Sequence, residues 1–158
     1  MNFQVGDKVI HCMYGLGEIV DFQEKVIQGI PQSCYVFEIT NMQIWIAIEA
    51  HGQKTLRKPT RPEEFEKLST ILSGPPEPLP LDRVLRKNLL YGRLRDGQLA
   101  SICGVVRDMF GYKRTNKLND QEHSIMDRAV SSLLAEWTYS LGIPVQEARR
   151  SMDALLGE

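Results

Sequence analysis

The sequence predicts an α+β protein with two domains, a small SH3-like or Tudor-like β-barrel followed by a compact all-α bundle. Hydrophobic residues alternate with polar ones from Phe3 to about Ala50, whereas from about Asp82 they recur at helical spacing. Between these regions, residues 73–80 contain four prolines, which remove backbone donors and cannot continue a helix. We therefore expect a barrel domain at residues 1–58, a short helix and a Pro-rich linker at 59–80, and a helical domain at 81–158.

The first domain accommodates four or five short strands separated by turns. The strands are expected at residues 8–11, 17–27, 34–39 and 44–48. In the last of them, strict alternation places Ile44, Ile46 and Ile48 on one face and Trp45 with Ala47 on the other. If the isoleucines face the core, Trp45 is left either as partly covered barrel surface or as a contact for a partner.

A short helix is expected to follow the barrel. Thr60 and Glu63 form a capping-box pattern, in which the hydroxyl accepts from a free backbone N–H and the carboxylate reaches back. Phe65, Leu68 and Leu72 then fall on one helical stripe.

Four further helices are expected after the Pro-rich segment. The first ends near Gly97 and the second near Gly111; the third begins at another capping-box pattern, residues 119–122, and stops at Gly142. Pro144 suits the first turn of the last helix. Their apolar stripes are Leu85 and Leu89; Leu99, Ile102, Val106 and Met109; Met126, Val130, Leu133 and Trp137; and Val145, Ala148, Met152 and Leu155. Trp137 is therefore expected in the core.

Positive charge is concentrated in one part of the chain, although the net charge is only −1. Residues 81–117 carry nine basic side chains against three acidic ones. The nine are Arg83, Arg86, Lys87, Arg93, Arg95, Arg107, Lys113, Arg114 and Lys117. Such a zone is explained either by solvated helix faces or by attraction to a nucleic-acid phosphate backbone.

Several functional classes are not supported by the sequence. Cys12, Cys34 and Cys103 are too scattered for a disulfide framework or a CxxC-type zinc site. The chain has no GxSxG, HExxH or P-loop motif, and no apolar run approaches the roughly 18 residues of a membrane span. We therefore expect a cytoplasmic protein that is not an enzyme, holds no metal or cofactor and does not associate with a membrane.

The opening residues carry a family resemblance. Phe3, Gly6-Asp7, Val9-Ile10-His11-Cys12, Tyr14-Gly15, Gly17 and Ile19 stand in an order that resembles the start of the CarD and CdnL family, whose N-terminal module also occurs in the transcription-repair coupling factor. The similarity continues along nearly the whole chain. It includes the Pro-rich junction, Arg86-Lys87-Asn88-Leu89, the run Val105-Val106-Arg107-Asp108-Met109, and Leu118-Asn119-Asp120-Gln121-Glu122.

For the N-terminal domain, this resemblance implies a bacterial transcription regulator that adds its edge strand to a sheet in the RNA polymerase β subunit. The implied polymerase contacts are Lys25, Trp45, Ile46 and Ala47. Ala47 stands where some members have an arginine, whereas Lys25 keeps a second basic contact, and Cys12 replaces the usual proline.

For the helical domain, the resemblance implies contact with promoter DNA at the upstream edge of the bubble, without a base code. A tryptophan of the family wedges into the minor groove there, and Leu81 stands at its position in this chain. Arg83, Arg86 and Lys87 lie at i, i+3 and i+4, where the family places phosphate contacts. Lys113 and Arg114 either extend this patch or solubilise a loop.

The departures from the family pattern favour polymerase docking over family-typical activation. The expected regulator is a nucleoid-associated monomer that modulates open-complex stability. The alternative is an adaptor that does not bind DNA, in which the β-domain binds polymerase or a repair helicase and the helical domain binds another protein. A steep salt dependence of DNA binding distinguishes the two, because only DNA binding releases condensed counterions.

Overall fold

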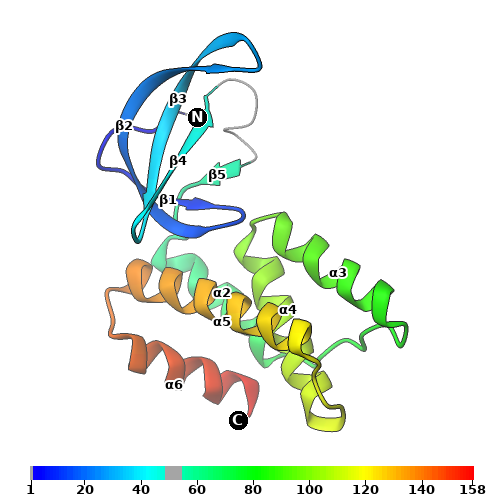
Figure 1. Cartoon of the computed structure of the whole chain (residues 1–158). Helices are drawn as coiled ribbons and strands as arrows, with labels where there is room; N and C mark the ends of the chain where they lie inside the picture. Colours follow the sequence, from blue (N-terminus) through cyan, green and yellow to red (C-terminus); the bar gives the residue numbers. More distant parts are fainter. Residues whose placement is uncertain (1, 49–54) are drawn as a thin grey trace. The chain divides into compact units, whose positions relative to one another are not determined.

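The computed structural model describes residues 2–48 and 55–158 (Figure 1). Its contacts divide the chain into two compact units, Met1–Pro59 and Thr60–Glu158. The first unit is built of strands and the second of helices. The predicted α+β layout with two domains is therefore confirmed.

The N-terminal unit is an antiparallel sheet with strand order β4-β3-β2-β1-β5. The strands are β1 (Lys8–His11), β2 (Gly15–Ile27), β3 (Ile30–Ile39), β4 (Met42–Ala47) and β5 (Leu56–Arg57). A bulge between Ile19 and Asp21 bends β2, and Figure 1 shows the long strands curving together. Within the described residues the expected barrel does not close, since β4 pairs only with β3 and the two-residue β5 pairs only with β1.

A small core lies on one face of this sheet. It contains Phe3, Val9, Ile19, Tyr35, Phe37, Ile46 and Leu56, with Ile44 and Ile48 packed against it. Trp45, on the opposite face of β4, keeps 39% of its surface exposed. The predicted separation of the isoleucines and Trp45 onto opposite faces is thus confirmed, and the isoleucines are on the face that packs against the core.

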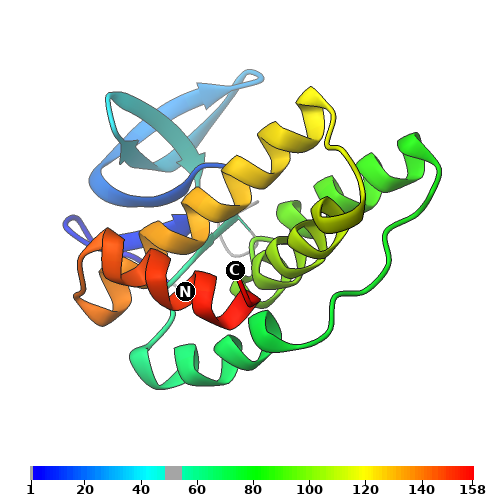
Figure 2. The ribbon, with the colours of Figure 1, turned by 90° about the horizontal axis from the view of Figure 1, so that it is seen from below.

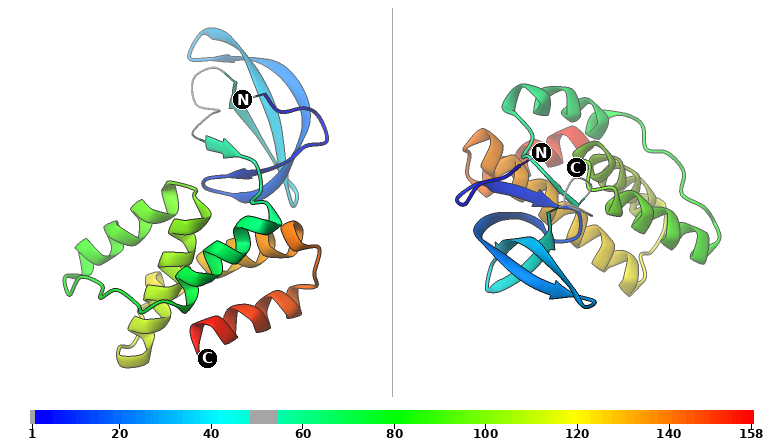
Figure 3. Two further views of the ribbon diagram at one scale, coloured as in Figure 1. Left: turned by 180° about the vertical axis from the view of Figure 1, so that it is seen from behind. Right: turned by 90° about the horizontal axis from the view of Figure 1, so that it is seen from above.

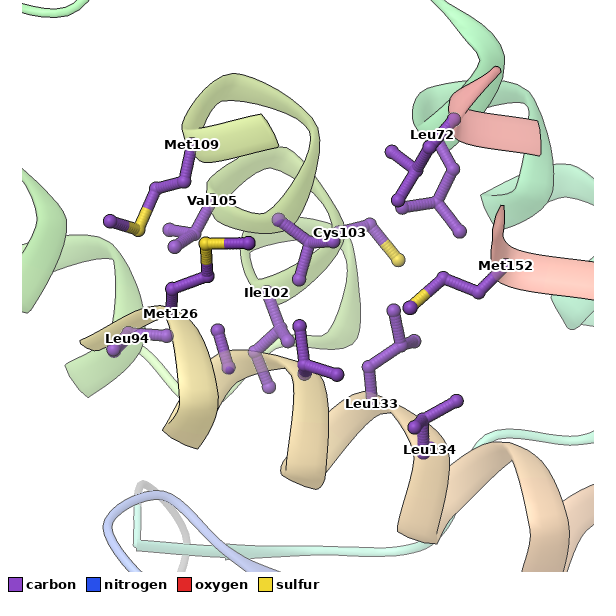
Figure 4. Packing of buried hydrophobic residues seen from close by; sticks show 14 of the residues in the cluster. Leu72, Leu94, Ile102, Cys103, Val105, Met109, Met126, Leu133, Leu134 and Met152 are labelled. Atoms are coloured by element: carbon purple, nitrogen blue, oxygen red, sulfur yellow. The ribbon is translucent and has the colours of Figure 1, made fainter. Parts of the chain in front are cut away.

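The C-terminal unit packs five helices around one core (Figures 2 and 3). They are α2 (Pro62–Ser73), α3 (Arg83–Arg95), α4 (Leu99–Thr115), α5 (Asp120–Leu141) and α6 (Val145–Leu156). Helix α4 packs against α2, α3 and α5, and α6 packs against α2 and α5. Figure 4 shows Cys103 of α4 in the same cluster as Leu133 and Met152. Burial raises the pKa of the Cys103 thiol to about 12, so this cysteine is an unionised core residue.

The segment expected to connect the two domains is part of the helical unit. Phe65 and Leu72 of α2 and Leu79 of the Pro-rich segment are all buried in the helical core. Pro76 also lies directly against α4, because a Cβ on Gly111 would overlap the Pro76 ring. The prolines therefore run along the surface of the bundle as one of its packed segments.

The two capping-box patterns have different outcomes. At α5 the prediction is confirmed: Glu122 N donates to Asn119 Oδ1 at 2.8 Å, and Asn119 N donates to Glu122 Oε1 at 3.1 Å. At α2 it is wrong, because the helix starts one residue later, with Arg61 as an N-cap that makes no side-chain bond and Pro62 in the first turn. Both the backbone N–H and the hydroxyl of Thr60 donate to Glu136 of α5 instead.

Helix α3 is rotated relative to the apolar stripe that marked it in the sequence. Leu85 is 61% exposed and Leu89 is also exposed, whereas Leu90 and Leu94 are buried. The predicted stripes of α4 and α5 do face the core, including Trp137. In α6, Ala148 and Met152 are buried, whereas Val145 is exposed. Within the described part of the chain, no helix is both long and apolar enough to cross a membrane.

Candidate functional site

The first candidate surface lies on the outer face of β4 and β2. Trp45 Nε1 donates to Gln23 Oε1 at 2.9 Å, and Lys25 Nζ lies 4.2 Å from the centroid of the Trp45 ring. The structure thus brings together Lys25 and Trp45, two of the residues predicted to contact polymerase. This cation–π contact and the bond to Gln23 restrain the exposed ring before any partner binds. We call Gln23, Lys25 and Trp45 the tryptophan cluster.

The other two predicted polymerase contacts have different environments. Ile46 is buried in the core beside Tyr35, so only its backbone is available to a partner. Ala47 is half-buried and pairs with Cys34. Because β4 is an edge of the described sheet, its free side can accept another strand.

The sequence reasoning missed two exposed apolar residues beside the β2–β3 turn. Val26 and Ile30 are more than half exposed and flank Gln28 and Gly29, which both have positive φ as in a type I′ turn. Their exposure could have been predicted from their position in the sequence, because side chains next to a two-residue hairpin turn are too far from a small core to pack against it. Ile30 pairs with Ile27 and Val26 pairs with Pro31, so the two side chains lie on opposite faces of the hairpin near its tip.

The second candidate surface is the start of α3. Leu81 is 96% exposed and directly precedes the N-cap residue Asp82, whose carboxylate accepts from Leu85 N at 2.9 Å. Arg83 is exposed on the first turn, and Lys87 is half-buried on the second. Val84 and Leu85 are exposed beside them. We call Leu81 with Val84 and Leu85 the apolar tip.

Arg86 does not share this exposed face, which corrects the expectation that it lines up with Arg83 and Lys87. Its side chain is buried, and Nε donates to Glu122 Oε2 at 2.6 Å. Its Nη1 donates to the carbonyls of Pro80 and Leu81, each at 3.1 Å, and its guanidinium lies 5.1 Å from the centroid of the Tyr112 ring. Arg86 faces inward because it shares the core stripe of α3 with Leu90 and Leu94.

Lys113 and Arg114 also differ from each other. Arg114 donates to the carbonyl of Leu156 and pairs with Glu158 at 3.2 Å, so it caps the end of α6. Lys113 is exposed, with Nζ 5.9 Å from the Phe110 ring centroid. Both side chains are exposed, but Arg114 is engaged at the end of α6, whereas Lys113 pairs with no carboxylate of the described residues.

Asp108 neutralises two more cations of the basic zone. Its fully buried carboxylate accepts from Arg93 Nη1 at 2.7 Å, from Arg107 Nε at 2.8 Å and from Glu77 N at 2.9 Å. The hydrogen bond to Asp108 raises the pKa of the Arg107 guanidinium. Among the residues that the structure describes, no carboxylate pairs with the other five cations of the zone, which are Arg83, Lys87, Arg95, Lys113 and Lys117.

A groove of about 330 Å³ opens beside Leu81. It lies between the Pro-rich segment and the end of α4, and Pro76, Leu79, Tyr112 and Asn116 are among its lining residues. The exposed Leu81 side chain therefore borders a hollow as well as the first turn of α3.

Comparisons with known proteins match both units. The family model described as CarD-like/TRCF RID domain matches residues 3–59, and the model described as CarD, C-terminal domain matches residues 67–153. A Bacillus subtilis (strain 168) protein named "Putative transcription factor YdeB" is 25% identical over 149 residues, which cover 93% of this chain and 97% of that protein. Each matched range falls within one of the two structural units.

Proposed function

The chain belongs to the CarD family of transcription regulators, and from this membership we propose that it binds the β subunit of bacterial RNA polymerase and contacts promoter DNA at the upstream edge of the bubble. The N-terminal unit is the polymerase-binding part in this proposal, and the helical unit is the DNA-binding part. The protein then modulates the stability of the open complex and resides with the nucleoid.

The polymerase half of the proposal is supported by the edge of the β-sheet. In the sheet of the described residues, β4 has no partner on its outer side and offers backbone groups for strand addition, and the tryptophan cluster offers an anchored ring beside a cation. Aromatic residues that lose little entropy on binding are typical centres of protein interfaces. Lys25, Trp45 and the backbone of Ile46 and Ala47 are the contacts we propose.

The DNA half rests on one observation, the 96% exposure of Leu81 beside cations. An apolar side chain that projects freely at a helix start can insert between base pairs, and Arg83, Lys87 and Lys113 can contact the phosphates on either side. Such a tip binds unwound DNA better than duplex, so it shifts the population toward the open complex without reading sequence.

The lifetime of the open complex on a bacterial promoter tests this proposal. The protein is added to cognate polymerase holoenzyme as wild type, as Leu81→Ala, and as the double variant Arg83→Ala with Lys87→Ala. We expect each variant to bind polymerase normally and to lose most of the effect on lifetime. The matched controls are Leu141→Ala and the double variant Arg149→Ala with Arg150→Ala, which change exposed residues of α5 and α6.

The adaptor function remains the alternative, because Val84 and Leu85 would also suit a protein partner. Binding of the protein to forked promoter DNA at 50 and 200 mM salt separates the two functions. A strong loss of affinity at the higher salt supports DNA binding through phosphates. Polymerase binding with no affinity for the fork and no change in open-complex lifetime supports the adaptor instead.

A further inference from the structure

We propose that Arg86 is a positioning residue that holds Leu81 in its projecting position before DNA arrives. This inference rests on the proposed function, because it assigns to Arg86 a role in presenting the apolar tip. Arg86 itself is not a DNA contact in this proposal, since its guanidinium is buried and engaged within the protein.

The first argument is that Leu81 cannot hold its own position. With 96% of its surface exposed, its side chain has almost no packing that would fix its direction. It also lies outside α3, whose first backbone bond runs from Arg86 N to the carbonyl of Asp82. The direction of the Leu81 side chain is therefore set by the backbone of residues 80 and 81.

Arg86 supplies the side-chain bonds that hold this backbone. Its Nη1 donates to the carbonyls of both Pro80 and Leu81 at 3.1 Å. These two carbonyls lie before the helix, where the backbone ladder of α3 does not reach them. One guanidinium nitrogen thus fixes two consecutive peptide units at the base of the tip.

The guanidinium is itself held from two other helices. Glu122 accepts from Arg86 Nε at 2.6 Å while its other oxygen accepts from Asn119 N in the capping box of α5. Tyr112 of α4 lies against the guanidinium. Arg86 therefore links the backbone at Leu81 to the end of α4 and the start of α5, and these two helices fix its position.

The position of Arg86 on the core face is difficult to explain by stability alone. Leu90 and Leu94 continue its stripe, so a methionine would suit the same face. A buried ion pair contributes little net stability compared with well-packed apolar residues, because both charges lose their hydration. What a methionine cannot supply is the pair of donors to Pro80 and Leu81. A tip held in its binding position loses less conformational entropy when it inserts.

The test compares Arg86→Met, Arg86→Lys, and Arg86→Met combined with Glu122→Gln in the full chain. The double variant removes the unpaired buried carboxylate that Arg86→Met leaves, and glutamine also suits the last position of a capping box, so the fold is kept. The matched control is Arg93→Met, which also removes an α3 arginine from a buried carboxylate but has no bond to residues 80 and 81. Each protein is measured for thermal unfolding, polymerase binding, open-complex lifetime and the NMR order parameter of the Leu81 amide.

We expect the double variant to unfold near the wild-type temperature and to bind polymerase normally. Its effect on open-complex lifetime should fall roughly three- to tenfold, the range expected when one side chain must be ordered on binding. The order parameter of Leu81 should fall with it, and Arg86→Lys should restore only part of both. Arg93→Met should leave both at the wild-type level.

Three results have distinct meanings. If Leu81→Ala shortens the lifetime and the double variant does not, the positioning role is refuted while the proposed function stands. If the double variant loses the effect but the Leu81 order parameter is unchanged, Arg86 acts on DNA directly and the positioning role is again refuted. If Leu81→Ala has no effect, the proposed function itself fails.

Discussion

Buried carboxylates pair with several arginines of this chain and so make them unavailable for contacts with phosphate. Asp108 accepts from Arg93, Arg107 and the backbone of Glu77, and Glu122 accepts from Arg86. Together with the capping role of Arg114, these contacts engage four of the nine basic residues counted in the zone at 81–117. The cations left for phosphate are Arg83 and Lys87 near the start of α3, Arg95 in its last turn, and Lys113 and Lys117 at and just after the end of α4.

Asp108→Asn should destabilise the helical unit by about 2–3 kcal/mol, slightly less than for a fully buried ion pair because Arg93 and Arg107 retain some solvent contact. The amide cannot accept from all three donors, and its NH₂ group faces a guanidinium. Urea unfolding followed by circular dichroism measures the change. The control is Asp127→Asn on the exposed side of α5, and equal stabilities of the two variants would contradict the role of Asp108.

The stability of the β-domain should depend on the protonation of His11. His11 is buried, its Nδ1 accepts from the backbone N–H of Met13 and Tyr14, and burial lowers its pKa below the ordinary 6.5. The unfolded chain therefore binds the proton more readily, so stability is fully present above about pH 6.5 and declines as the pH falls below it.

This dependence is measured as the free energy of unfolding between pH 7.5 and 5, together with an NMR titration of the His11 ring. His11→Gln should remove most of the slope in this range. An unchanged slope in that variant, or a ring that titrates at or above 6.5, would refute the prediction.

At the scale of elements, α3 shows how a helix can be predicted while its orientation is not. The pairs Leu85 with Leu89 and Leu90 with Leu94 both have i, i+4 spacing, so the sequence offers two apolar faces. The structure buries the second pair, and Arg86 on the same stripe pairs with Glu122 of α5. The first pair is left exposed beside Leu81.

The contact between α4 and the Pro-rich segment depends on the absence of one side chain. Gly111→Ala would place a Cβ against the Pro76 ring, so we expect a destabilisation of about 1–3 kcal/mol from the forced shift. Gly92→Ala is the matched control in α3, where nothing lies within 4 Å of the added atom. The control should be stabilised by up to about 1 kcal/mol, because alanine is the better helix former. Thermal unfolding checks both, and a stabilised Gly111→Ala would disprove the close packing.

At the scale of the whole molecule, the division between Pro59 and Thr60 sets which fragments can fold. A fragment of residues 60–158 retains Phe65, Leu72 and Leu79 in its core, whereas a fragment of residues 81–158 lacks all three. We expect the longer fragment to unfold cooperatively and the shorter one to have lost several kcal/mol, since each large buried apolar residue contributes about 2–5 kcal/mol. Calorimetry of the two fragments provides the measurement, and equal unfolding temperatures would show that α2 is dispensable.

The sequence predicted those features of the fold that depend on neighbouring residues. Alternation placed Ile44, Ile46 and Ile48 together on one face, which the structure shows to be the core face, and the capping box at Asn119 marked the start of α5. It could not predict contacts with distant partners. Thr60 fails to cap α2 because Glu136 accepts both of its donors, and Arg86 leaves the exposed face because of Glu122. In the candidate site, alternation separated Trp45 from the isoleucines and the family resemblance singled out Leu81, whereas neither indicated the burial of Arg86.

The hydrogen bonds between Thr60 and Glu136 also determine where the two units can be separated in a fusion protein. They attach the first residue of the helical unit to α5, so both partners of this contact belong to the helical unit. A crossover between the codons of Pro59 and Thr60 would therefore transfer the helical unit with both Thr60–Glu136 hydrogen bonds intact. The same junction is the natural splice point for chimaeras in which another N-terminal module is joined to these helices.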